Sequence, residues 1–89
     1  MEKGLQAALR RFPHRGQEIW RLALTNSTFR SLCDDFADAE AALDLWAVSN
    51  AIHSAQRRSE YQILTDELAA EVEHTLDAHL GETHFPRGL

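Results

Sequence analysis

The sequence predicts an all-α protein, a long antiparallel helical hairpin preceded by one or two short N-terminal helices. Glycine and proline are both absent between Gly16 and Gly81, which is typical of long helices. Residues that favour helix, such as Ala, Leu, Glu, Gln and Arg, dominate the chain, and no run alternates apolar and polar residues as a strand would. With 89 residues and 44% hydrophobic positions, the chain has the size of one small domain and too much apolar character for a disordered segment.

Two short helices are predicted in the N-terminal part, at about residues 2–11 and 13–24. Pro13 separates them, because proline disfavours helix at the residue before it and suits the first turn of a new helix. A polar stretch follows, and either Asn26 or Ser27 is expected to accept the free amide hydrogens at the start of the next helix.

Two long helices are predicted at about residues 27–52 and 58–80, because apolar residues recur there every three or four positions. A more polar stretch between the two apolar patterns is expected to hold the reversal of the chain. Gly81 suits the position that follows a helix. The helical domain is therefore expected to span residues 1–81, and residues 82–89 to form a flexible tail.

The apolar stripes of the two long helices form the predicted core and self-association surface. Two helices alone cannot enclose side chains as large as Phe29, Phe36 and Trp46. We therefore expect the short helices to fold back over the seam and a second copy to complete the bundle, as a homodimer or a higher homo-oligomer. The ten stripe residues are Phe29, Leu32, Phe36, Leu43 and Trp46 in the first long helix, and Tyr61, Leu64, Leu68, Val72 and Leu76 in the second.

The net charge of −5 divides unevenly along the chain. Residues 1–30 hold six basic side chains against two acidic ones, a net +4, whereas residues 31–89 hold three against twelve, a net −9. This polarity predicts docking of the basic head on the acidic body, within one chain or between two. Asp34, Asp35 and Asp38 are the expected partners of the arginines.

Part of the basic head is a candidate contact for an unknown protein partner, because tryptophan and arginine together are typical of binding hot spots. Two interpretations are open for Trp20, which either packs in the core or projects into such a contact. The same arginines are compatible with a nucleic-acid accessory role, which the acidic remainder of the chain opposes. The candidate contact residues are Arg10, Arg11, Arg15, Trp20 and Arg21.

A metal-binding alternative uses Glu40, Glu71 and His74. One Glu from one helix and a Glu-x-x-His from another make the half-site of di-iron four-helix bundles, and a dimer of hairpins would supply two halves. Such an oxygen-rich set suits iron or manganese better than zinc. The competing interpretation is a solvated acidic face, and the metal site requires Glu71 to face the seam, where Val72 competes with it.

The remaining residues predict no catalysis by this chain alone and no cofactor. Cys33 is the one cysteine, has no histidine within its helical turn, and is expected to be a buried structural residue. The sequence has no glycine-rich phosphate loop and no nucleophile elbow. Since no apolar run approaches the length of a membrane span, we expect no membrane association and a cytoplasmic location.

Several of these positions together resemble a known family. They are Leu9-x-x-Phe12-Pro13, Ile19-x-x-Leu22, Asn26-x-x-Phe29-x-x-Leu32-x-x-x-Phe36 and Tyr61-x-x-Leu64-x-x-Glu67-Leu68. The pattern is similar to the YdcH-like family of small bacterial proteins and covers roughly residues 9–76. The resemblance implies an α-helical hairpin that associates with copies of itself, with no established activity and no functional residues to carry over. The chain departs from the family in its Ala/Ser-rich link and in extra C-terminal residues.

Overall fold

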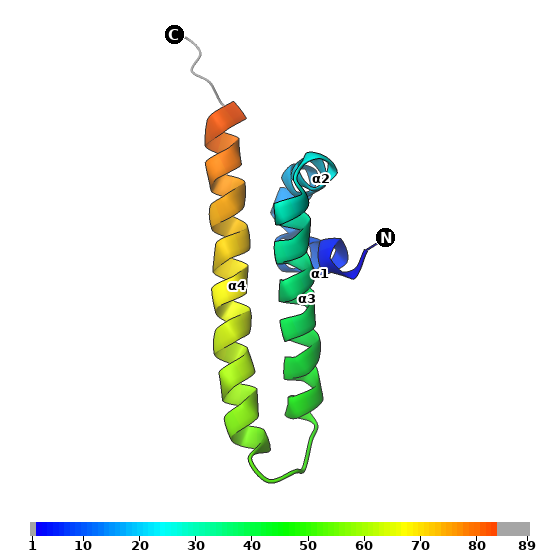
Figure 1. The fold of residues 1–89 in the computed structure, drawn as a ribbon, viewed down its shortest axis with the longest axis vertical. Helices are drawn as coiled ribbons and strands as arrows, with labels where there is room; N and C mark the ends of the chain where they lie inside the picture. The colour runs from blue at the N-terminus through cyan, green and yellow to red at the C-terminus, as the bar shows by residue number, and fades with distance from the viewer. Residues whose placement is uncertain (1, 84–89) are drawn as a thin grey trace.

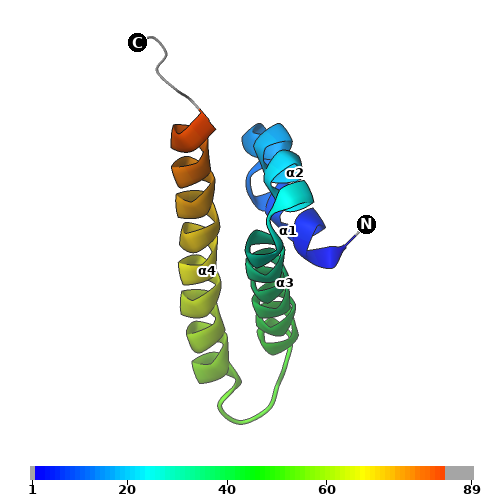
Figure 2. The same cartoon turned by 45° about the horizontal axis from the view of Figure 1, so that its top comes forward.

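The protein is an all-α helical hairpin with two short helices in front of it, as predicted. The computed structural model describes residues 2–83, and these form four α-helices and one 3₁₀ turn without any strand. In chain order the elements are α1 (Lys3–Arg11), the 3₁₀ turn η1 (Pro13–Arg15), α2 (Gly16–Thr25), α3 (Ser27–Ala47) and α4 (Ser54–Thr83). Helices α3 and α4 run antiparallel and side by side, while α1 and α2 pack toward the first half of α3 (Figures 1 and 2).

The breaks between the short helices have local causes that the sequence predicts. Pro13 occupies the first turn of η1, and Phe12 before it leaves the helical region with φ −127° and ψ 66°. At the start of α3 the Asn26 side chain caps the helix, because its Oδ1 accepts a hydrogen bond of 2.9 Å from the Phe29 amide. Asn26 rather than Ser27 is therefore the N-cap.

The reversal between the long helices lies earlier in the chain than predicted and occupies residues 48–53. Helix α3 ends at Ala47 rather than near residue 52, because Ser49 takes the backbone into a turn in which its Oγ accepts a hydrogen bond of 3.1 Å from the Ala51 amide. His53 adopts a left-handed φ of 73°, and α4 begins directly after it. The second long helix thus starts four residues before its predicted position.

The predicted end of the second long helix at Gly81 is wrong. Helix α4 continues through Gly81 to Thr83, because one glycine costs only about 1 kcal/mol in a helix interior and does not by itself stop a long helix. Residues 82 and 83 of the predicted tail therefore belong to the helix, and residues 84–89 lie outside the described part of the chain.

The core lies where the short helices meet the hairpin. One cluster joins Ile19 of α2, Phe29 and Cys33 of α3 and Val72 and Leu76 of α4, all of them fully or almost fully buried. A second cluster around Phe36 continues it along the seam. Burying each large apolar side chain contributes about 1.5–3 kcal/mol, so this end carries most of the stability.

Helix α1 approaches α3 closely because small residues face it. Ala7 and Ala8 are fully buried, and Gly4 lies against the backbone of α3. A Cβ atom at Gly4 would lie 2.6 Å from the Asp34 amide nitrogen, which no side chain tolerates. The short helices thus cover one side of the first half of α3 and leave the rest of the hairpin open. Along residues 2–83 no helix combines the length and the hydropathy that a bilayer crossing requires.

Candidate functional site

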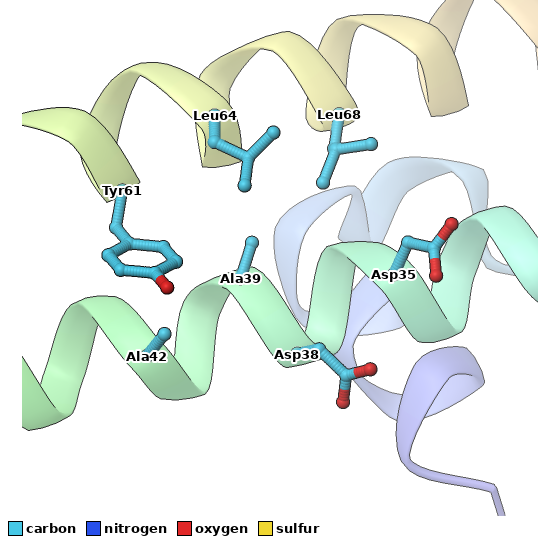
Figure 3. A pocket seen from close by; sticks show the side chains of 7 residues that line it. All are labelled: Asp35, Asp38, Ala39, Ala42, Tyr61, Leu64 and Leu68. Atoms are coloured by element: carbon cyan, nitrogen blue, oxygen red, sulfur yellow. The ribbon is translucent and has the colours of Figure 1, made fainter.

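An open groove between α3 and α4 is the candidate functional site (Figure 3). Its volume is about 420 Å³, and its lining comes from the two long helices alone. The close-up shows Tyr61, Leu64 and Leu68 extending from α4 toward α3, where Ala39 and Ala42 form the opposite wall. The groove is therefore apolar in its middle, and it can take apolar side chains from another polypeptide.

One end of the groove is acidic. Asp35 and Asp38 line it on α3, at the end where Leu68 stands on α4 (Figure 3). Asp38 binds Lys3 with an oxygen–nitrogen distance of 2.5 Å, and this hydrogen bond raises the pKa of Lys3. Asp35 has no ion pair among the described residues and is exposed. The acidic end therefore keeps a negative charge that no residue in the described part of the chain neutralises.

The structure divides the ten predicted stripe residues into two groups. Phe29, Phe36, Val72 and Leu76 are buried within the single chain and cannot reach a second one. The others lie nearer the surface. Leu32, Leu43, Trp46, Tyr61 and Leu68 are half-buried, and Leu64 is 40% exposed.

In the part of α4 that lines the groove, the buried face of the helix differs from the predicted stripe. Thr65 and Ala69 face the core there, followed by Val72 and Leu76, with spacings of four, three and four residues. Sequence reasoning missed Thr65 and Ala69 because neither is large or strongly apolar. The predicted residues Tyr61, Leu64 and Leu68 instead turn toward the open groove, and this rotation creates the site.

Exposed apolar residues near the reversal were also missed. Leu45, Val48, Ile52 and Ile63 have between 59% and 83% of their surface exposed. Val48 and Ile52 belong to the connection, which is outside any helical repeat, so no periodic signal identifies them. The hairpin therefore presents more apolar surface at this end than its stripe alone predicts.

The basic head docks on the acidic body within one chain, mostly through acids other than those predicted. Lys3 pairs with Asp38, whereas Arg10 pairs with Glu40 at 3.6 Å. The largest contribution to the raised pKa of Arg15 is its hydrogen bond with Glu18, at 2.6 Å, and Nη1 of Arg15 also reaches Asp77 at 2.6 Å. No ion pair of Asp34 or Asp35 occurs in the described part of the chain.

The remaining candidate partner contacts lie on the surface. Arg11 stacks over the Phe12 ring at 5.1 Å, and Arg21 is exposed with no ion pair within residues 2–83. Trp20 is 43% exposed and therefore does not pack fully in the core. It lines a second hollow of about 660 Å³ together with Glu2, Leu5, Ala23, Leu24 and Arg30.

A single chain does not assemble the predicted metal half-site. Val72 is fully buried in the seam, so its neighbour Glu71 points to solvent, and His74 is exposed as well. Glu40 is engaged by Arg10. In the described part of the chain no three His, Cys, Asp or Glu side chains lie close enough to hold a metal ion together.

Cys33 is the free thiol of the core. It is 1% exposed, and burial raises the pKa of its thiol from 9.0 to about 11. At neutral pH the thiol is therefore protonated and poorly nucleophilic. Its surroundings fit the structural role that the sequence predicts.

Comparison with protein-family models, with curated proteins and with solved structures found no match for this chain.

Proposed function

We propose that this protein is a helical interaction protein that works by associating with a second copy of itself through the open groove. The groove formed by Ala39, Ala42, Tyr61, Leu64 and Leu68 carries the proposal, because all of these apolar side chains except the buried Ala39 keep some contact with water. Each copy contributes this surface to a symmetric pair, so every apolar contact counts twice.

The sizes of the residues that line the groove support this function. Alanine on α3 allows another helix to approach closely, and the larger residues on α4 supply the area that is removed from water. Burying a leucine side chain contributes about 1.5–3 kcal/mol. Leu64 and Leu68 are already partly buried in the single chain, so only the remaining part of this contribution is available at each of them. Two copies of both residues therefore offset part of the several kcal/mol that association costs in lost freedom of motion.

Light scattering coupled to size-exclusion chromatography tests the proposal. We expect the wild-type chain to elute as an oligomer whose mass falls on dilution, and Leu64→Glu to elute as a monomer with unchanged helical content. Leu64 is partly exposed in the single chain, so the variant should still fold.

Ile63→Glu is the matched control, since Ile63 is the adjacent residue, is exposed, and does not line the groove. This variant adds the same charge and should keep the wild-type mass. The proposal fails if the wild-type chain is a monomer at every concentration, or if the two variants dissociate equally.

A further inference from the structure

The apolar part of the groove on α4 lies between a positive and a negative side chain. Arg57 is one helical turn before Tyr61, and Glu71 is one turn after Leu68. These charged residues and the three groove residues between them lie on one face of the helix, because their spacings are four, three, four and three. In chain order the five are Arg57, Tyr61, Leu64, Leu68 and Glu71. Both charged side chains are exposed.

The charged ends of this pattern are equidistant from Leu64. Arg57 and Glu71 each lie seven residues from it, which is roughly 10 Å along the helix in either direction. On α3 the groove residues Asp35, Ala39 and Ala42 are continued by Trp46 at a spacing of four, and the centre of these four positions lies between the two alanines. Figure 3 shows Leu64 extending toward Ala39, so the centre of the α4 pattern lies close to the alanines of α3.

We propose that two copies meet groove to groove in an antiparallel arrangement, with the two-fold axis beside Leu64 and with Arg57 of each copy facing the partner's Glu71. This inference rests on the proposed function and adds its geometry and the residues that determine its orientation. Because the axis passes the centres of both helices, α4 faces the partner's α4 and α3 faces the partner's α3.

Charge complementarity selects this orientation over a parallel one. A parallel pair of α4 helices would place Arg57 against itself and Glu71 against itself, and like charges at such positions are unfavourable. In the antiparallel pair opposite charges meet twice. Arg57 donates to its own Glu60 through Nη1 at 3.0 Å, which leaves its other guanidinium donors for the partner.

The acidic end also disfavours a foreign acidic helix as the occupant. Asp35, Glu67 and Glu71 are exposed near that end and have no ion pair within residues 2–83. In the antiparallel dimer this end lies over the partner's reversal end, which bears Arg57. The small side chain of Ala42, half-buried in the single chain, lets the two α3 helices approach closely beneath the larger contacts of α4.

A charge-swap series measured by analytical ultracentrifugation at low salt tests the arrangement. Arg57→Glu and Glu71→Arg should each raise the dimer dissociation constant about tenfold, since each replaces two attractive contacts by repulsive ones. The double variant Arg57→Glu/Glu71→Arg restores opposite charges across the axis, so its dissociation constant should return to within about threefold of wild type.

Arg58→Glu and Glu73→Arg are the matched controls, because they make the same charge changes at exposed positions of α4 outside the five-residue pattern. They should leave the dissociation constant nearly unchanged. A dimer whose double variant remains as weak as the single variants overturns the antiparallel arrangement and leaves the proposed function intact. A wild-type monomer overturns both.

Cross-linking provides a second readout that does not depend on charge. A residue beside a two-fold axis lies next to its own copy, so Leu64→Cys should form a covalent dimer with a short bismaleimide, whereas Ile63→Cys should not. The buried Cys33 thiol, with its pKa raised to about 11, is expected to stay unreacted in both. Equal cross-linking at the two positions contradicts the proposed axis.

Discussion

Gly4 of α1 lies directly against the backbone of Asp34 in α3, and a Cβ atom at Gly4 would come within 2.6 Å of the Asp34 amide nitrogen. This contact lets α1 cross α3 closely enough to bury Ala7 and Ala8 completely. A glycine in a helix is usually a weakness, because it costs about 1 kcal/mol relative to alanine. Here it is the condition for docking the short helices on the hairpin.

Gly4→Ala is therefore expected to lower the free energy of unfolding by about 1–3 kcal/mol, despite the better helix propensity of alanine. Gly16→Ala is the control, because the nearest atom to a Cβ there is Leu9 Cδ2 at 3.7 Å and the backbone is already helical. This second variant should be neutral or slightly stabilising. Urea denaturation followed by circular dichroism compares the two, and equal stabilities would contradict the close crossing.

Thr65→Val is expected to raise the free energy of unfolding by about 1 kcal/mol, because it removes a polar group that has no partner. Thr65 is 7% exposed, and its Oγ1 makes no hydrogen bond to any of the described residues. The control is Thr75→Val, since the Thr75 hydroxyl donates to the Glu71 carbonyl oxygen at 2.8 Å. That variant should be neutral or slightly destabilised in the same denaturation assay. A loss of stability at Thr65 would show that its hydroxyl has a partner.

The Cys33 thiol should make stability depend on pH in the alkaline range. Its pKa is raised by burial from 9.0 to about 11, so between these values the folded chain keeps a proton that the unfolded chain releases. Stability is therefore retained below pH 9.0 and falls as the pH rises toward 11, with a slope approaching about 1.4 kcal/mol per pH unit. Urea titrations across this range measure the slope.

Cys33→Ala is the reference for that slope, because it removes the titrating group while all other groups remain. Lys3, whose pKa is also raised, contributes equally to the pH dependence of the wild type and of the variant, so its contribution cancels in the difference between them. We expect the alanine variant to be less stable at neutral pH, owing to the atoms lost from the core, and to lose less stability per pH unit above pH 9. Identical slopes would contradict a protonated buried thiol.

Arg15 joins the start of α2 to the far part of α4, since it binds Glu18 and Asp77 together and its side chain is only 17% exposed. Arg15→Gln should lower the free energy of unfolding by about 1 kcal/mol. Arg21→Gln removes the same charge from an exposed side chain that has no ion pair with any described residue, and it should change stability by less than about 0.5 kcal/mol. Thermal denaturation of both variants separates the effect of this contact from that of net charge.

Local signals in the sequence correctly predict the helical elements. The break at Pro13 and the cap at Asn26 depend on residues adjacent in the chain, so composition and spacing suffice to identify them. The helix ends near the reversal and at Gly81 are less predictable. They depend on a side-chain turn at Ser49 and on the small cost of one glycine in a long helix.

The candidate site was predicted only in part, because the rotation of α4 does not follow from hydropathy. Large side chains such as Tyr61 and Leu64 dominate any apolar pattern, whereas the residues that face the core beside them, Thr65 and Ala69, are small. Close packing of two helices selects small residues, and their burial gives no strong signal in one sequence. The metal half-site does not form within one chain for a reason that the sequence does indicate, since Val72 takes the buried position in the seam and Glu71 points outward.

The amino-acid sequence alone determined the all-α hairpin, its division into short and long helices, and the polarity of a basic head and an acidic body. Only the tertiary structure decided which face of α4 is buried and which acids the head binds, such as Glu40 and Asp77. Helix formation depends on neighbours within a few residues, whereas helix rotation and ion pairing depend on side chains distant in the chain. The close crossing at Gly4 and the small residues between α3 and α4 determine how near the helices approach one another, and this packing leaves Leu64 in an open groove.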